Sequence, residues 1–150
     1  MALEFRLVSS DDADALADLF AALREAGDET AFHPHALDAE TARAIAGRET
    51  EDLYYVAIDE RRVLAYGILR GWDDGYDVPS LGIAVRPDER GSGIGRLTML
   101  LLHEAARRKG ATSIRLKVYP SNDVALGLYR SLGYAFDGEE GGQLVGRVEL

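Results

Sequence analysis

The sequence predicts an α/β fold in which a mixed sheet carries helices on both faces. Segments with a two-residue apolar period, typical of strands, alternate with segments of helical period. The expected order is β-α-α-β-β-β-α-β-α-β-β, and its best-defined unit is the strand, loop, helix and strand from Leu81 to Tyr119. With 150 residues and no linker-like stretch, residues 1–150 are expected to form one domain with its own core.

The first half of the chain contains two expected helices and three expected strands. Residues 3–8 alternate like a strand, and residues 37–48 form a short helix with Asp38 as its N-cap. Residues 52–60 and 61–72 form a hairpin. Residues 9–27 form an amphipathic helix that ends at Gly27. Its apolar face comprises Ala13, Leu16, Leu19, Phe20 and Leu23.

The second half continues the alternation after a polar loop at residues 73–79. Residues 80–85 form a short apolar strand, and residues 112–120 form a strand that ends at Pro120. Residues 121–133 form a helix that stops at Gly133. Residues 134–140 and 143–150 form a last pair of strands, of which the final one either completes its own sheet or pairs across a homodimer.

Composition narrows the classes of partner. The chain has no cysteine, which excludes disulfides, zinc–thiolate sites and a thiol nucleophile. The formal net charge of -9 argues against nucleic acid, which needs a basic face, and favours solubility or a cationic substrate. We find neither a signal-peptide pattern nor an apolar run of the ~20 residues that span a bilayer. The expectation is a cytoplasmic protein without membrane partners.

A glycine-rich loop follows the strand at residues 80–85 and precedes the longest amphipathic helix. Gly91, Gly93 and Gly95 alternate there, and Arg90 and Arg96 flank them. A helix N-terminus has unpaired N–H groups that attract anions, and glycine lets a phosphate approach the backbone closely. The two arginines add charge-assisted donors. The pattern therefore predicts a phosphate-binding loop.

Three phosphate loops compete for this stretch. A Walker A loop requires a Gly-Lys-Ser/Thr ending, which is missing. A dinucleotide loop requires G-x-G-x-x-G directly after the strand and an acidic residue after the next strand, and neither is present. The third pattern is R-x-x-G-x-G, filled by Arg90, Gly93 and Gly95. It resembles the coenzyme A diphosphate loop of the GNAT superfamily, the acetyl-CoA-dependent N-acyltransferases.

The stretch from Asn122 to Tyr134 extends that resemblance. In the superfamily, the strand after the glycine-loop helix splays from its neighbour, the pantetheine arm lies between them, and an asparagine, a tyrosine and a Gly-Phe/Tyr pair follow. Asn122, Tyr129, Gly133 and Tyr134 match those positions. The resemblance implies a mostly antiparallel sheet with splayed central strands, and acetyl-CoA as cosubstrate without a metal. It further implies cofactor contacts from Ala84, Val85, Arg90, Gly91, Ser92, Gly93, Gly95, Arg96 and Asn122.

The implied reaction is direct attack of an amine on the acetyl thioester, and it assigns two catalytic groups. The oxyanion needs a fixed donor, for which the backbone N–H of Val85 is suited. The leaving sulfur needs a proton, and Tyr129 is the candidate acid. A phenol of pKa about 10 is modestly mismatched to a thiol of about 8.5.

The acceptor side is less defined by the sequence. Asp73, Asp77 and His33 are the expected substrate contacts, for a small-molecule or peptide amine. The general base remains open among Asp73, Asp74, Asp77, Glu29, His33 and His35. Trp72 either joins an ammonium site with these acids or packs inward. Two rival functions stay open: a non-catalytic acyl-CoA binding module and a dinucleotide-binding protein.

Overall fold

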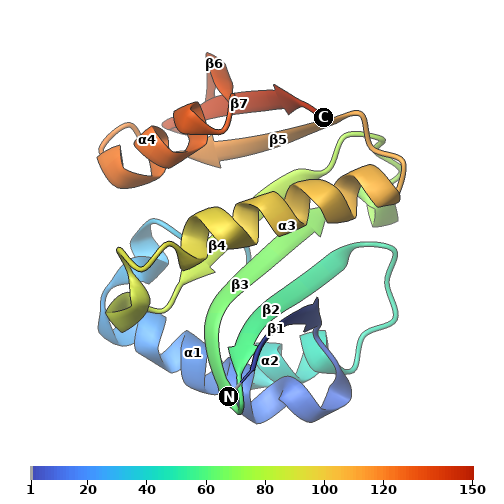
Figure 1. The fold of residues 1–150 in the computed structure, drawn as a ribbon, viewed down its shortest axis with the longest axis vertical. Coiled ribbons are helices and arrows are strands. Elements are labelled where there is room, and N and C mark those ends of the chain that lie inside the picture. The colour runs from blue at the N-terminus through green and yellow to red at the C-terminus, as the bar shows by residue number, and fades with distance from the viewer. Residues whose placement is uncertain (1) are drawn as a thin grey trace.

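A computed structural model describes residues 2–150, which form one seven-stranded sheet between two helical layers (Figure 1). The strands lie in the order β1-β2-β3-β4-β5-β7-β6. Neighbouring strands are antiparallel except β4 and β5, which are parallel. The strands are β1 (Leu3–Leu7), β2 (Leu53–Asp59), β3 (Arg62–Arg70), β4 (Ser80–Val85), β5 (Ser113–Val118), β6 (Ala135–Glu140) and β7 (Gln143–Glu149). The expected mixed, mostly antiparallel sheet is confirmed.

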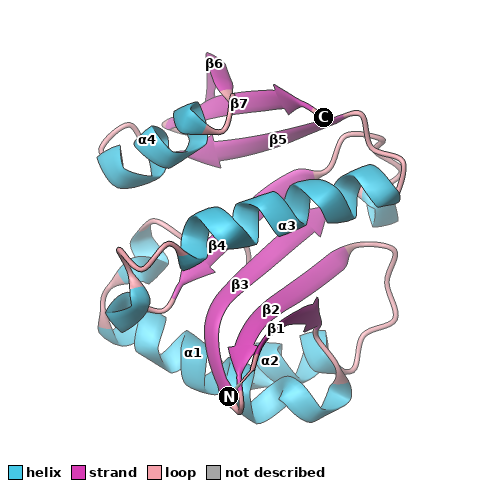
Figure 2. Ribbon diagram, in the orientation of Figure 1, coloured by secondary structure: helices cyan, strands magenta, loops and turns pink. Residues whose placement is uncertain are grey.

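Four α-helices cover the sheet in the expected order (Figure 2). Asp38 caps α2 (Ala39–Ala46) by accepting the Thr41 N–H at 2.8 Å, and Gly27 ends the first helical segment with φ of 77°. Residues 10–12 form a separate 3₁₀ turn, so the first helix begins later than the sequence predicts. The helices are α1 (Ala13–Glu25), α2 (Ala39–Ala46), α3 (Ile94–Arg108) and α4 (Asp123–Ser131). Within residues 2–150, no helix has the length and apolar character needed to cross a bilayer.

One core lies between α1, α2 and the first strands of the sheet. Leu16, Leu19, Phe20 and Leu23 of α1 are fully buried there, as the helical period predicts. They pack with the side chains that β2 and β3 direct to this face, among them Tyr66. This layer fixes β3 and β4 from one side.

The second core lies between the opposite face of the sheet and helices α3 and α4. Met99 and Leu102 of α3 and Leu126 and Tyr129 of α4 belong to it. Close packing of α3 on β3 depends on Gly67, because a Cβ at that position would lie 2.7 Å from Leu102 Cδ1. The two cores put a helix pair on each face, as expected.

The central strands β4 and β5 diverge along their length. Their register contains one residue pair, which joins Ser80, the first residue of β4, to Arg115, the third residue of β5. The backbone N–H of Arg115 donates to the Pro79 carbonyl at 3.0 Å next to this pair. Beyond it the strands separate, which confirms the expected splay.

The last two strands complete the sheet within the same chain. β7 pairs antiparallel with β5 along its length and with β6 on its other edge. Of the two possibilities open from the sequence, β7 therefore finishes its own sheet.

We expect Gly67→Ala to lower the free energy of unfolding by about 1–3 kcal/mol, because the new methyl overpacks buried Leu102. Chemical denaturation at neutral pH measures this change. Gly127→Ala is the matched control: its Cβ meets nothing within 4 Å, and alanine favours the helix, so we expect a gain of up to about 1 kcal/mol. A Gly67→Ala protein as stable as the parent would contradict this packing.

Candidate active site

The glycine loop forms a turn that ends at the N-terminus of α3. Gly91 has φ of 79° and Gly93, the N-cap residue, has φ of 88°, so both lie in the left-handed region that favours glycine. No side chain of the described residues caps α3 at this end. The first N–H groups of the helix are therefore free for an external acceptor, and the helix dipole adds partial positive charge.

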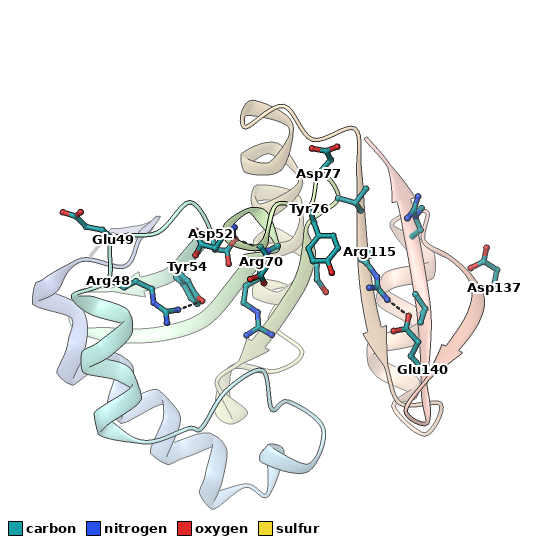
Figure 3. A pocket seen from close by; sticks show the side chains of 17 residues that line it. Arg48, Glu49, Asp52, Tyr54, Arg70, Tyr76, Asp77, Arg115, Asp137 and Glu140 are labelled. Atoms are coloured by element: carbon teal, nitrogen blue, oxygen red, sulfur yellow. Dashed lines mark hydrogen bonds and ion pairs between the residues drawn. The ribbon is translucent and has the colours of Figure 1, made fainter.

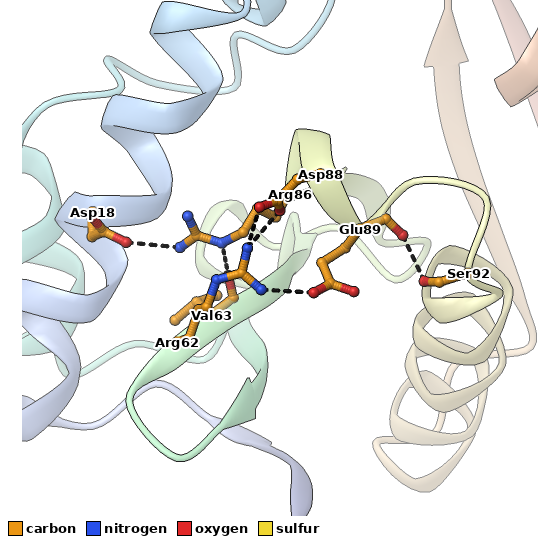
Figure 4. A network of polar contacts seen from close by, with 7 residues as sticks. All are labelled: Asp18, Arg62, Val63, Arg86, Asp88, Glu89 and Ser92. Atoms are coloured by element: carbon orange, nitrogen blue, oxygen red, sulfur yellow. Dashed lines mark hydrogen bonds and ion pairs between the residues drawn. The ribbon is translucent and has the colours of Figure 1, made fainter.

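Ion pairs hold the approach to this loop against the rest of the molecule (Figure 4). Buried Arg86 donates to the Val63 carbonyl at 2.7 Å and to Asp18 of α1 at 2.9 Å. Arg62 at the start of β3 binds Asp88 at 2.5 Å and Glu89 at 2.6 Å. These contacts neutralise the acids beside the loop and fix the turn that leads into it.

The two arginines of the loop reach different elements. Arg90 forms an ion pair with Asp28 and donates to the Val85 carbonyl at 3.3 Å. Arg96, in the first turn of α3, donates to the Ser131 hydroxyl of α4 at 3.0 Å. A Cβ at Gly95 would lie 3.3 Å from Val85 and 3.9 Å from Leu128, so this glycine allows α3, α4 and β4 to meet.

The end of β4 turns backbone groups toward the diverging side of the sheet. The N–H of Arg86 donates to the Leu64 carbonyl at 2.8 Å, which makes residues 64 and 86 a hydrogen-bonded pair of the β3–β4 ladder. Such pairs alternate along antiparallel strands. Since Ala65 lies opposite Val85, the N–H and C=O groups of Val85 and Ile83 point away from β3. Ala84, between them, directs its backbone groups to β3.

Helix α4 places Tyr129 and Asn122 beside these elements. The Asn122 side chain accepts the N–H of Ala125 at 3.3 Å and so caps α4. Tyr129 is 8% exposed, and its ring centroid lies 5.8 Å from that of Tyr134. Leu126 is buried on the same helix face, in agreement with the spacing.

Burial raises the pKa of Tyr129 to about 12. The difference between the pKa of Tyr129 and the pKa of a thiol in water is therefore larger than the pKa of a free phenol would suggest. The same burial keeps the phenol protonated at neutral and mildly alkaline pH.

The segment between α1 and α2 brings two histidines to the other face of the sheet. His33 Nε2 lies 2.9 Å from the Tyr119 hydroxyl, just past the end of β5. His35 Nδ1 donates to the Ala36 carbonyl, so its Nε2 accepts from the Tyr66 hydroxyl at 2.9 Å. Burial lowers the pKa of His35, so this ring is neutral and both of its nitrogens are occupied.

A cleft of about 1390 Å³ opens on the same face, at the paired end of β4 and β5 (Figure 3). We call it the sheet-face cleft. Its lining includes Arg48, Arg70, Tyr76, Asp77, Arg115 and Arg147. Ser80 and Arg115, the one residue pair that joins β4 to β5, also line it.

The two acidic residues expected to contact the substrate both line the cleft, but the carboxylate of one of them is engaged in hydrogen bonds within the protein. Asp73 lines the cleft, but its carboxylate accepts the Thr50 hydroxyl and the Glu51 N–H. Asp77 lies at the cleft and is exposed. Trp72 packs against the α3 core, with Lys109 Nζ 5.0 Å from its ring, so it faces inward. No cluster of three or more potential metal ligands occurs among residues 2–150.

A family model described as the acetyltransferase (GNAT) family matches residues 14–134. The chain belongs to this family. The resemblance inferred from the glycine loop and the Asn122–Tyr134 stretch is thereby confirmed, and both motifs lie inside the matched residues.

Individual relatives of this GNAT chain match in sequence over short segments and in fold over the whole chain. A streptothricin acetyltransferase from Streptomyces lavendulae is 43% identical over 56 residues, which cover 37% of this chain and 30% of that protein. The PaiA N-acetyltransferase of Thermoplasma acidophilum in complex with coenzyme A covers 100% of both chains, with a TM-score of 0.82 and 16% identity. A GCN5-related N-acetyltransferase from Kribbella flavida covers 99% and 98%, with a TM-score of 0.80 and 25% identity.

The structure brings the predicted cofactor residues of the GNAT chain together but separates the acceptor residues. Val85, Gly95 and Arg96 adjoin α4, which carries Tyr129 and begins after Asn122. Ala84 departs from the prediction, because its side chain belongs to the core with α1 and α2 on the opposite face and its backbone groups pair with β3. His33 lies at Tyr119, whereas Asp73 and Asp77 line the sheet-face cleft. Sequence reasoning missed Ile83, Tyr119, Arg70 and Arg115. The two-residue period of β5 would have put Arg115 and Tyr119 on one face, but Ile83 requires the β3–β4 register.

Replacing Tyr129 by Phe should change how stability depends on alkaline pH. Above pH 10 an unfolded tyrosine loses its proton while folded Tyr129, with its raised pKa, keeps it, so stability falls. At pH 11 this contribution is about 1.4 kcal/mol. Urea unfolding at several pH values should show a shallower loss for Tyr129→Phe above pH 10 and parallel profiles below pH 9. Parallel profiles throughout would contradict the pKa shift.

Proposed function

We propose that this protein is an N-acetyltransferase that moves the acetyl group of acetyl-CoA to a primary amine by direct attack. The observation that carries the proposal is the position of the uncapped N-terminus of α3 beside the diverging ends of β4 and β5. That arrangement offers an anion site and, next to it, unpaired strand backbone. Family membership supports the same chemistry.

The glycine loop would hold the diphosphate of coenzyme A. The N–H groups at the start of α3 point outward without a side-chain cap, and Arg90 and Arg96 supply charge-assisted donors. Exposed Arg90 would exchange its half-buried partner Asp28 for a diphosphate oxygen. An ordinary surface ion pair costs little to exchange.

The pantetheine arm would run between β4 and β5 toward their paired end. Val85 and Ile83 direct N–H and C=O groups to this side of β4, so an extended arm can bond to them as a strand would. Val85 N–H is the predicted oxyanion donor. Ile83 N–H has the same orientation and lies nearer the paired end, so it is a second donor for the developing negative charge.

The proposed reaction forms one bond, breaks another and moves one proton to the leaving group. The amine nitrogen bonds to the acetyl carbon, the C–S bond breaks, and the thiolate takes the Tyr129 proton. The raised pKa of Tyr129 makes that proton hard to release into water. A thiolate leaving into the same apolar surroundings is itself made more basic by burial, which reduces the mismatch.

The amine proton needs an acceptor on the opposite face of the sheet, and we assign this role to His33. His35 has both nitrogens engaged, whereas His33 Nδ1 has no hydrogen-bond partner among residues 2–150. Tyr119 holds the other nitrogen of His33 at 2.9 Å and thereby orients the ring.

Acetyl-CoA should raise the melting temperature of the protein, because it binds the native state. Gly93→Leu should abolish that increase by placing a side chain at the diphosphate position. Gly110→Leu is the matched control: Gly110 also has positive φ and open space around it, but it lies at the other end of α3. Absence of any shift at millimolar acetyl-CoA, or equal loss in both variants, would contradict the assignment.

Tyr129→Phe should leave acetyl-CoA binding intact and lower kcat by roughly 10²-fold or more, the usual contribution of a general acid. Release of the CoA thiol in the presence of an amine panel measures turnover, and the thermal shift measures binding. Normal turnover by Tyr129→Phe would remove the acid assignment. Binding without thiol release by the parent protein, across the panel, would instead indicate a non-catalytic acyl-CoA module.

A further inference from the structure

Three arginines occupy one row across the floor of the sheet-face cleft. The register pairs Arg70 of β3 with Ser80 of β4, Ser80 with Arg115 of β5, and Arg115 with Arg147 of β7. Residues directly opposite in neighbouring strands share a face, so these side chains rise on the same side of the sheet. All four residues line the cleft.

The arginine row is an unfavourable arrangement of charges for a β-sheet. Arg115 and Arg147 lie directly opposite each other, with Cα atoms about 5 Å apart, and like charges in that position are destabilising. A chain with 26 acidic and 17 basic residues could easily pair every arginine. Within residues 2–150, however, neither Arg70 nor Arg147 forms an ion pair, and Arg115 pairs only with exposed Glu140 of β6. Departures of this kind from a local rule are typical of functional sites.

Of the acids that line the cleft, only Glu140 pairs with an arginine of this row. Buried Asp52 accepts the N–H groups of Gly71 and Asp73, and Asp73 accepts from residues 50 and 51. The remaining acids of the lining are exposed. Arg70 donates to the Pro34 carbonyl at 2.9 Å and is half-buried, which strengthens its field.

The row lies where the acceptor would have to lie. The pantetheine arm proposed above approaches the paired end of β4 and β5, and that end is the Ser80–Arg115 pair of the row. An amine held in the cleft would thus meet the thioester from the face opposite α3. Exposed Tyr76 lines the cleft too, and in Figure 3 its ring lies between Arg70 and Arg115, where it can contact the body of a small ligand.

We propose that the arginine row binds an oxyanion of the acceptor, so that the substrate is an amine carrying a carboxylate or a phosphate. The inference rests on the proposed acetyl transfer for the amine end of the ligand. Planar guanidinium groups bind either oxyanion through two parallel hydrogen bonds. The acceptor is therefore zwitterionic at neutral pH, which also fits exposed acids at the edge of the same cleft.

Matched acceptor pairs test the charge requirement. We compare glycine with glycinamide, β-alanine with its amide, and 2-aminoethyl phosphate with ethanolamine in the thiol-release assay with acetyl-CoA. In each pair, the compound with the carboxylate or phosphate should have a kcat/KM about 10- to 100-fold above that of the compound without it. This is the effect expected of charged hydrogen bonds. The carboxylate and phosphate pairs distinguish the two oxyanions. Equal or better use of the neutral members would overturn the proposal while leaving the acetyltransferase assignment intact.

Variants assign the effect to the row. Arg147→Gln removes an exposed side chain that has no ion pair among residues 2–150, so the protein should fold. It should raise KM for the anionic acceptor about tenfold and leave the neutral partner unchanged, and Arg147→Lys should recover part of the loss. Arg61→Gln is the control: Arg61 is exposed in the β2–β3 turn, at the other end of β3 from Arg70. An equal loss for both members of a pair would contradict a role in anion binding.

Inorganic phosphate provides a readout that needs no turnover. With saturating CoA present to occupy the glycine loop, and at constant ionic strength, phosphate should raise the melting temperature of the parent and of Arg61→Gln more than that of Arg147→Gln. An identical response in all three proteins would overturn the proposal. This comparison stands even if acetyl-CoA fails to stabilise the protein, a result that would remove the proposed function alone.

Discussion

The divergence of β4 from β5 is the constraint on which the rest of this structure depends. β4 is hydrogen-bonded along its whole length to β3 but meets β5 at a single residue pair. Backbone groups left unpaired inside a sheet must be satisfied by another partner. The diverging ends leave backbone of β4 free beside the glycine loop, and the paired end of the same two strands lines the sheet-face cleft, so both proposed half-sites adjoin one break in the ladder.

The arginines on the two sides of this break differ in whether they have carboxylate partners. Around the glycine loop, Arg62, Arg86 and Arg90 all bind carboxylates, which keeps the free protein compact there. In the cleft, Arg70 and Arg147 have no carboxylate partner among the described residues. The ion pairs stabilise the arginine side chains around the glycine loop until a ligand displaces the carboxylates. The unpaired guanidinium groups of the cleft keep their full positive charge for a ligand.

Much of the fold could be predicted from the residues, because the signals are local. The apolar period of α1, the Asp38 cap and the stop at Gly27 each depend on neighbours within a few positions. The glycine loop could be found for the same reason. Other parts of the site could not, because the orientation of Ile83, the His33–Tyr119 contact and the neutral state of His35 depend on residues far apart in the chain.

The sequence by itself determined the order of the elements, the family and the position of the glycine loop, since a few adjacent residues encode each of these. Only the tertiary structure decided that β7 completes the sheet of its own chain and that burial holds the proton of Tyr129. It also decided that Arg70, Arg115 and Arg147 form one row. Strand register and burial arise from the packing of distant segments, and neither is written in the spacing of neighbouring residues.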